Sequence, residues 1–167
     1  MLKDYIKPYP DLVFDDDIFE PLRLSYASEV TNFPKYLDAL AVSPYKHPHR
    51  IRLNNCLDAM RTAVETSFLV FLSPFPEKSV IFVVNIFGRI DGSTANRALL
   101  NNDGHLLDII FGDFFILGEN PETGDFCSLT DEQFEFFEKM FFTPQIFVEE
   151  NDQLLIKPLP EHLVSKP

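Results

Sequence analysis

Two histidines flank a proline in the segment His47, Pro48 and His49. Imidazole nitrogens are common ligands of transition metals, and residues two apart on a β-strand point to the same side, so both rings can face one ion. The proline disfavours a regular strand, and no cysteine or carboxylate near the pair in the sequence completes a ligand set. The pair predicts either a metal site at His47 and His49 or a plain surface loop, and we favour the loop.

Asn96 and Arg97 form a second candidate site. A guanidinium donates paired hydrogen bonds to a phosphate or a carboxylate, so Arg97 would bind such a ligand beside Asn96. The alternative, which we favour, is that Asn96 caps the turn that follows and Arg97 pairs with an acidic neighbour. Under the first interpretation Arg97 joins His47 and His49 around a concave pocket, and the protein is a small-ligand binder or a metal-dependent enzyme.

The remaining reactive side chains do not favour catalysis. Asp108 and Asp113 lie five residues apart on one expected strand, which places them on opposite faces and argues against a pair of catalytic carboxylates. Cys127 directly precedes a helix cap, and we interpret it as a buried, inert thiol. Phosphate-loop, dinucleotide-binding and zinc-finger motifs are absent from the sequence, so no cofactor is expected.

Acidic side chains are the strongest remaining feature. The net charge is −12, which disfavours direct nucleic-acid binding, because such binding requires clustered Lys and Arg. Residues 119–138 contain seven acidic residues and no basic one. Candidate partner-binding residues on the outer face of the helix expected there are Asp131, Glu132, Glu135 and Glu138. This face would imitate nucleic-acid phosphates in a basic groove of a partner protein, or it is only a solvated face, which we favour.

The helix that carries these carboxylates is predicted over residues 130–142. Thr130 and Gln133 have the spacing of a capping box, and Pro144 ends the helix. At about 100° per residue, four large side chains share an apolar arc with Phe134. They are Phe136, Phe137, Met140 and Phe141.

Local patterns predict the other elements. A helix capped by Asn54 or Asn55 would bury Leu57, Met60 and Val64 and end near Ser67. Short buried strands are expected over 68–72, 79–87 and 107–117, with a single helical turn over 96–100 and a terminal hairpin of 145–149 and 153–157. Residues 29–41 would hold a short helix around a proline.

Composition divides the chain into three parts. Residues 1–53 form a nearly neutral segment rich in proline, residues 54–143 carry fourteen acidic and five basic side chains, and residues 144–167 form a hairpin and tail. The first residues contain no apolar run typical of a signal peptide, no segment suits a membrane span, and the two cysteines are too few for a disulfide framework. We therefore expect a cytoplasmic protein without a membrane segment.

Three motifs carry a resemblance to a known family: N-R-A-L-L at 96–100, D-I-I-F-G-D-F-F-I-L-G at 108–118 and S-L-T-D-E-Q-F-E at 128–135. With L-D-A-M at 57–60 and N-x-x-G-R at 85–89, they make residues 54–142 resemble an uncharacterised bacterial family, domain of unknown function 3846. Its members are carried largely by phages, plasmids and conjugative elements. The resemblance implies such an origin and a small mixed α/β domain, implies no catalytic residue, and leaves residues 1–53 atypical of the family.

These observations together predict a small α+β fold. Two helices pack against a mixed or antiparallel sheet, and an irregular N-terminal segment wraps or extends that sheet. The predicted function is that of a non-enzymatic acidic interaction protein of a mobile element, with a host or defence protein as its partner. Five of the eighteen phenylalanines lie between 134 and 142, which also favours a homodimer.

Overall fold

The structure, a computed structural model, describes residues 34–166. Residues 1–33 and 167 lie outside the described residues, and so does the first part of the helix expected over 29–41. A six-stranded antiparallel sheet forms the centre, in the order β2 (His49–Asn54), β1 (Tyr36–Val42), β7 (Phe114–Glu119), β4 (Val80–Asn85) and β3 (Leu69–Leu72). The short strand β8 (Phe126–Cys127) also pairs with β7.

Two further sheets are hairpins of two strands each. β5 (Ala95–Leu100) pairs with β6 (Leu106–Phe111), and β9 (Gln145–Glu150) pairs with β10 (Gln153–Pro158). The backbone N–H of Ala98 in β5 donates to Oε1 of Gln145 in β9 at 2.8 Å, which joins the two hairpins. Short 3-10 turns, η3 (Pro76–Lys78) and η4 (Glu161–Leu163), complete the described elements.

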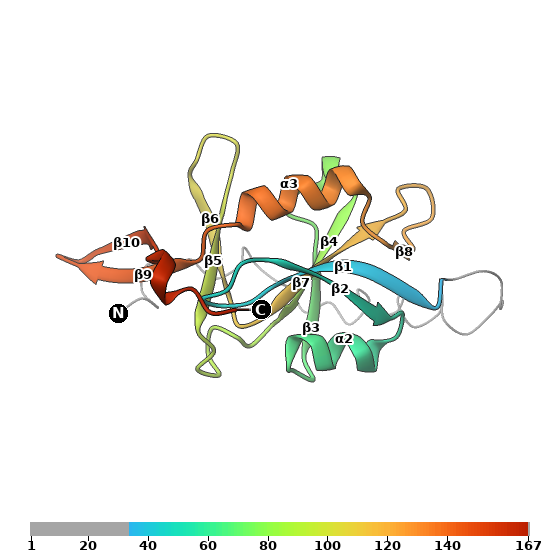
Figure 1. The fold of residues 1–167 in the computed structure, drawn as a ribbon, viewed down its shortest axis with the longest axis horizontal. Helices are drawn as coiled ribbons and strands as arrows, with labels where there is room; N and C mark the ends of the chain where they lie inside the picture. Colours follow the sequence, from blue (N-terminus) through green and yellow to red (C-terminus); the bar gives the residue numbers. More distant parts are fainter. Residues whose placement is uncertain (1–33, 167) are drawn as a thin grey trace, which may run out of the picture. The chain divides into compact units, whose positions relative to one another are not determined.

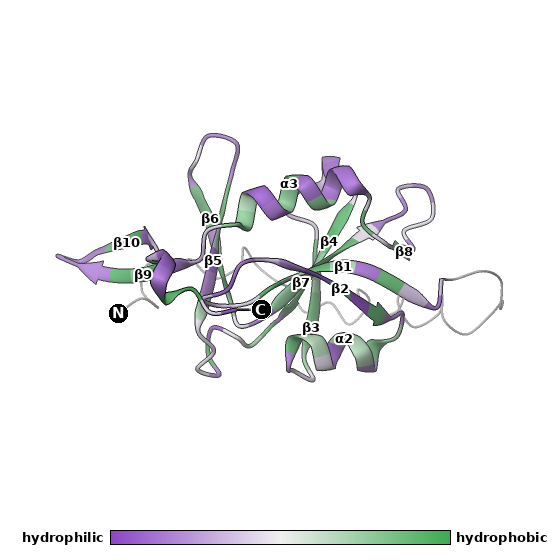
Figure 2. Ribbon diagram, in the orientation of Figure 1, coloured by the Kyte–Doolittle hydropathy of each residue, from purple (hydrophilic) through white to green (hydrophobic). Residues whose placement is uncertain are grey.

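The two α-helices lie on opposite faces of the central sheet (Figure 1). α3 (Asp131–Phe141) packs Phe134, Phe137 and Phe141 on one face, and α2 (Leu57–Val64) packs Met60 and Val64 on the other. The two strands β4 and β7 are apolar and buried on both faces, because each face is covered by a helix. Figure 2 shows this pattern as green in β4 and β7 and purple on the exposed turns of α3.

Phenyl rings account for the α3 side of the core. The ring of Phe82 in β4 lies 5.6 Å from Phe137, 5.8 Å from Phe114 and 5.9 Å from Phe141, measured between centroids. Such pairs are stabilising beyond the area that they bury, by about 0.5–1.5 kcal/mol each. The high phenylalanine content is therefore partly explained by one cluster between α3 and the sheet.

The predicted α+β fold class is wrong. Among residues 34–166, strands make up 43% and helices 19%, in ten strands arranged as three antiparallel sheets, with only two α-helices in this range. The error has a local cause, since three segments that looked irregular or helical are strands. They are β1, β2 and β5. Each obtains its hydrogen bonds from a neighbouring strand and not from its own turn.

Two further expectations need correction. The strand expected over 107–117 is two strands, β6 and β7, in different sheets, because Gly112 turns the chain with a φ of +75°. The N-cap of α2 is Cys56, which makes no side-chain cap hydrogen bond, and not Asn54 or Asn55. The predicted helix 130–142, the strands 68–72 and 79–87 and the terminal hairpin are confirmed with shifts of at most two residues at their ends.

Candidate functional site

The N-terminus of α3 has the capping box that the sequence predicts. Gln133 N donates to Oγ1 of Thr130 at 3.2 Å, and Thr130 N donates to Oε1 of Gln133 at 2.9 Å. Gln133 Nε2 also donates to the carbonyl oxygen of Lys78 at 2.7 Å. The cap thus fixes both the start of the helix and its position beside η3.

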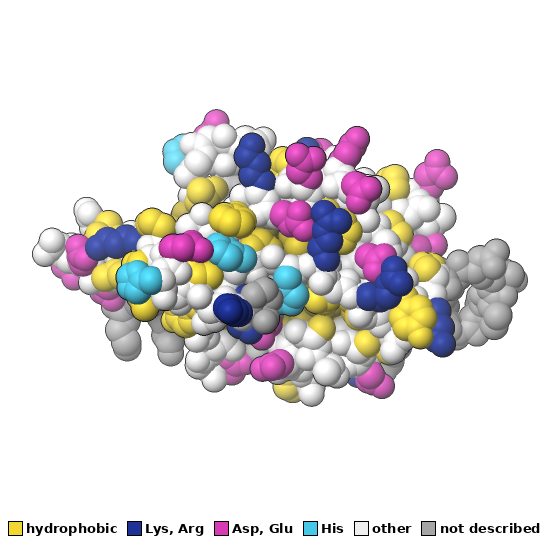
Figure 3. All heavy atoms as spheres, viewed as in Figure 1, with side chains coloured by type: hydrophobic (Ala, Val, Ile, Leu, Met, Phe, Trp, Pro, Cys, Tyr) yellow, Lys and Arg dark blue, Asp and Glu magenta, His cyan; other side chains and the backbone are white. Residues whose placement is uncertain are grey.

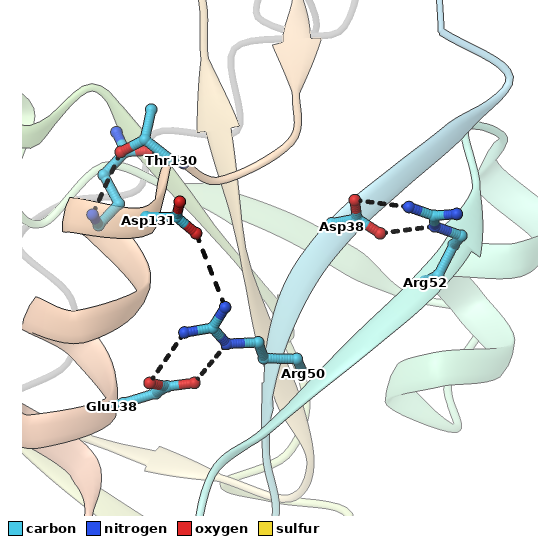
Figure 4. Close-up of polar contacts among 7 residues, drawn as sticks. Asp38, Arg50, Arg52, Thr130, Asp131 and Glu138 are labelled. Atoms are coloured by element: carbon cyan, nitrogen blue, oxygen red, sulfur yellow. Dashed lines mark hydrogen bonds and ion pairs between the residues drawn. The ribbon is translucent and has the colours of Figure 1, made fainter.

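Arg50 of β2 connects the acidic face of α3 to the edge of the central sheet (Figure 4). Its Nε lies 2.8 Å from Oε1 of Glu138, and its Nη1 lies 3.8 Å from Oδ1 of Asp131. Its guanidinium carbon also lies 4.3 Å from the centroid of the Phe134 ring. The hydrogen bond to Glu138 raises the pKa of Arg50, so this arginine stays charged over the working pH range.

Among residues 34–166, two of the four predicted partner-binding carboxylates form ion pairs with Arg50, and two form none. Glu132 and Glu135 are exposed, and no ion pair involves either of them among residues 34–166. We call Asp131, Glu132, Glu135 and Glu138 together the acidic α3 surface. Figure 3 shows acidic side chains over α3, with basic side chains beside them over β1 and β2.

The sequence does not predict the role of Arg50, because Glu138 lies 88 residues away along the chain. The alternation of Arg50, Ile51, Arg52 and Leu53 is typical of a half-buried strand and is the signal that indicates this segment. Arg52 belongs to the same pattern and hydrogen-bonds Asp38 of β1 through two nitrogens, at 2.6 and 2.9 Å. The hydrogen bond from Arg52 lowers the pKa of Asp38.

Arg97 is buried, with 1% of its surface exposed. Its Nε donates to the carbonyl oxygen of Phe141 at 3.1 Å, its Nη2 to that of Lys46 at 2.7 Å, and its Nη1 to Oδ1 of Asn96 at 2.8 Å. Burial lowers the pKa of Arg97 to about 10, which still leaves the side chain charged at neutral pH. All three acceptors are neutral oxygens, and none belongs to the acidic neighbour that was expected. Through the two carbonyl oxygens, Arg97 joins β5 to the end of α3 and to the segment that follows β1.

Asn96 is equally buried and is part of β5, so it does not cap a turn. Its Nδ2 donates to the carbonyl oxygens of Val42 at 2.9 Å and Gly112 at 2.7 Å. Both residues of the predicted ligand pair are thus hydrogen-bonded to main chain, and Arg97 has almost no surface through which a ligand would reach it. This geometry favours a structural role for the pair.

His47 lies close to Arg97 but is engaged in other contacts. Its ring stacks on that of Phe142 at 4.3 Å between centroids, its Nδ1 lies 2.7 Å from the carbonyl oxygen of Phe142, and its Nε2 lies 3.2 Å from Oε1 of Glu161. Both partners are acceptors, so both ring nitrogens donate only when the imidazole is protonated. The hydrogen bond to the Phe142 carbonyl raises the pKa of His47 accordingly.

The second histidine of the predicted metal pair has a different environment. His49 begins β2, opposite Ala41 of β1, and its buried Nδ1 has no hydrogen-bond partner in the described chain. Within residues 34–166, no group of three or more His, Cys, Asp or Glu side chains is arranged to hold a metal ion. The metal site at His47 and His49 stays a prediction, with no third ligand beside it in the part of the chain that the structure describes.

The other reactive groups are dispersed. Asp108 in β6 pairs with Arg89, whereas Asp113 lies in the turn between β6 and β7, so the two do not share a strand. Cys127 is half-buried in β8, and burial raises the pKa of its thiol, which makes it a weak nucleophile.

A cavity of about 430 Å³ lies beside α3, and no pattern in the sequence predicts it. Phe136 and Met140 line it, although the helical periodicity assigns both to the buried arc. The lining also includes residues of η3, of the β5 end and of β9, which no local pattern brings together.

Comparison with known proteins gives one match. The family described as a domain of unknown function (DUF3846) matches residues 37–142. This range begins in β1 and not near residue 54, so it includes β1 and β2 as well as α3. No curated protein and no solved structure matches the chain. Because the match covers more than half of the sequence, the chain belongs to this family, domain of unknown function DUF3846.

Proposed function

We propose that this protein is a non-catalytic interaction protein that binds a basic partner protein through the acidic α3 surface. The observation that carries the proposal is the exposure of Glu132 and Glu135 without an ion pair among the described residues. Unpaired carboxylates on one rigid element attract a basic surface and accelerate its association.

The contacts that hold α3 in place support the proposal. Arg50 holds the helix through Glu138 and Asp131, and the capping box holds its start. A helix fixed at both places presents its remaining carboxylates in one arrangement, so little conformational entropy is lost when a partner binds.

The proposal extends to the setting of the protein. An origin in a phage or conjugative element, which the family resemblance implies, makes a nucleic-acid-binding host protein in the cytoplasm the expected partner. Such a protein has a basic groove that complements the acidic α3 surface, while a net charge of −12 opposes direct binding to nucleic acid. No helix among residues 34–166 has the length and apolar character needed to cross a membrane.

A pair of charge-reversal variants tests the proposal. E132K/E135K reverses the two carboxylates of this surface that form no ion pair among the described residues. D58K/E65K reverses two exposed carboxylates, Asp58 on α2 and Glu65 at the C-cap of α2, on the opposite face of the sheet. Asp58 and Glu132 are each the second residue of their helix, so D58K and E132K perturb the two helix dipoles similarly.

The measurement has two stages. Proteins captured by the wild-type chain from a host extract are purified, and their affinity for the wild type and both variants is determined at low and high salt. We expect a basic partner whose affinity falls at least about tenfold with E132K/E135K, is unchanged with D58K/E65K, and weakens as salt increases. Equal affinity of the two variants for every captured protein would refute the role of the acidic α3 surface.

A further inference from the structure

The cavity beside α3 has an apolar floor and apolar walls. It opens between the second half of α3, the turn η3 and the tip of the β5–β6 hairpin, which rises beside α3 in Figure 1. Phe75 and Phe141 are buried in its floor, and its walls are Phe136, Met140 and Leu100, exposed by 37%, 42% and 42%. A volume of about 430 Å³ with this lining is typical of sites for small organic molecules.

Two amide side chains at the rim offer donors. Oε1 of Gln145 already accepts from Ala98 N at 2.8 Å, and Oδ1 of Asn101 accepts from the backbone N–H groups of Asp103 and His105 at 3.0 and 2.8 Å. These bonds fix the orientation of both amides, since an oxygen must face each N–H. Neither NH₂ group has an acceptor among the described residues, so both remain available to a ligand.

Lys78 adds a positive charge to the same rim. Its Nζ lies 4.2 Å from the centroid of the Phe136 ring, and no carboxylate pairs with it in the described chain. Its backbone is held by the hydrogen bond from Gln133 of α3. Glu77 is the one carboxylate among the described lining residues, and it forms no ion pair with Lys78.

We infer that this cavity binds a small organic acid with an aromatic or aliphatic body. The body lies on Phe75 and Phe141 between the apolar walls, and the carboxylate accepts from Lys78 and from the amide NH₂ groups of the rim. Burial of the apolar body against these side chains removes apolar surface from water and provides the affinity. Lys78 and the amide NH₂ groups of the rim, which have no acceptor among the described residues, select an anion over a neutral analogue. This inference is independent of the acidic α3 surface and concerns another side of the helix.

A second copy of the chain is the competing occupant. The sequence favours a homodimer through exposed phenylalanines of α3, and Phe136 is one of them. The donors at the rim favour the organic acid over a second copy of the chain, because a contact between identical apolar faces does not require a cation and two oriented amides.

The test titrates the full-length ¹⁵N-labelled chain with indole-3-acetate and, separately, with the neutral indole-3-acetamide. We expect saturable shifts at the cavity residues, with the acetate bound at least about fivefold more tightly. K78M should remove this preference, and K139M, on α3 but outside the cavity, should preserve it. M140E places a carboxylate on the wall and should weaken acetate binding at least about tenfold.

Three results would overturn the inference. They are an absence of saturable shifts up to about 10 mM, equal affinity for the acid and the amide, and shifts that are the same in M140E as in the wild type. Light scattering at the titration concentration tests whether a second copy of the chain occupies the cavity. If the wild type is a dimer that excludes the ligand, and M140E dissociates this dimer, the cavity is a contact between two copies.

Discussion

Replacing Arg97 by methionine tests whether this buried arginine holds the domain together. R97M retains an unbranched apolar stem, with a side chain of similar volume that ends two atoms short of the terminal guanidinium nitrogens, and removes every side-chain donor. Phe141 at the end of α3 and Lys46 in the turn after β1 each lose the hydrogen bond to their carbonyl oxygen. The change therefore disconnects a helix and a turn from β5 without creating a large cavity.

The expected loss follows from these contacts. A buried acceptor left without a donor costs about 1–3 kcal/mol, so the two carbonyl oxygens and the amide oxygen of Asn96 account for about 3–9 kcal/mol. Removing a buried cation whose bonding partners are neutral oxygens offsets part of this cost. We expect the free energy of unfolding to fall by about 2–4 kcal/mol, which corresponds to a decrease in Tm of about 5–15 °C.

A second variant separates charge from donor geometry. R97K keeps the charge, but its three donors belong to one nitrogen, which cannot reproduce the fork that reaches both carbonyl oxygens. R97K should therefore be destabilised nearly as much as R97M. R61M is the control. Arg61 is exposed on α2 and, within the described part of the chain, forms an ion pair with Asp58 alone, so the change should cost less than about 0.5 kcal/mol.

Urea unfolding followed by far-UV circular dichroism is the appropriate assay, because the chain has no tryptophan for fluorescence. If R97M is as stable as the wild type, the carbonyl contacts contribute nothing and the reasoning is refuted. If R97K alone retains wild-type stability, the charge matters and the fork geometry does not.

Three further predictions concern other contacts. The pKa of His47 is raised, so the stability that its contacts add is fully present below the unfolded-state pKa of about 6.5 and is lost as the pH rises through the folded-state pKa. The difference in the free energy of unfolding between wild type and H47F should therefore shrink from pH 5 to pH 8. A constant difference would contradict this. A Cβ at Gly88 would lie 2.8 Å from the carbonyl oxygen of Phe111, so G88A should lower the urea midpoint by an amount equivalent to about 1–3 kcal/mol, whereas an unchanged midpoint would mean that the backbone adjusts freely. T130A should cost about 1 kcal/mol and T130S much less, as measured by Tm, because only the alanine removes the cap of α3.

The elements that the sequence predicted well are specified locally. The capping box, the apolar periodicity and Pro144 lie within or next to α3, so a short window of sequence contains all the information for that helix. The same holds for the terminal hairpin, whose two strands are joined by Asn151 and Asp152, both with positive φ.

The elements that the sequence did not predict depend on distant partners. β1 pairs with β7, which lies more than seventy residues later in the sequence. The burial of the apolar residues of β1 depends on this pairing, so no local pattern predicts it. β5 contains two polar residues, Asn96 and Arg97, which are compatible with burial only because Val42, Lys46 and Phe141 supply their acceptors. No spacing rule within five residues identifies such a strand.

The candidate sites divide in the same way. The acidic face follows from helical periodicity alone, but which of its carboxylates pair with Arg50 depends on the position of β2, a separate element. The cavity requires four separate segments and has no signature in any of them.

The position of β1 inside the central sheet has a practical consequence for shortened versions of the protein. β1 covers the edge of β7 along Phe114, Phe115 and Ile116. A fragment that starts at residue 54, where the family resemblance read from the sequence begins, lacks both β1 and β2. Its β7 would present a row of unsatisfied N–H and C=O groups flanked by large apolar side chains, which is a template for pairing with other chains. Such a fragment should aggregate, whereas one that begins ahead of Tyr36 keeps this edge covered.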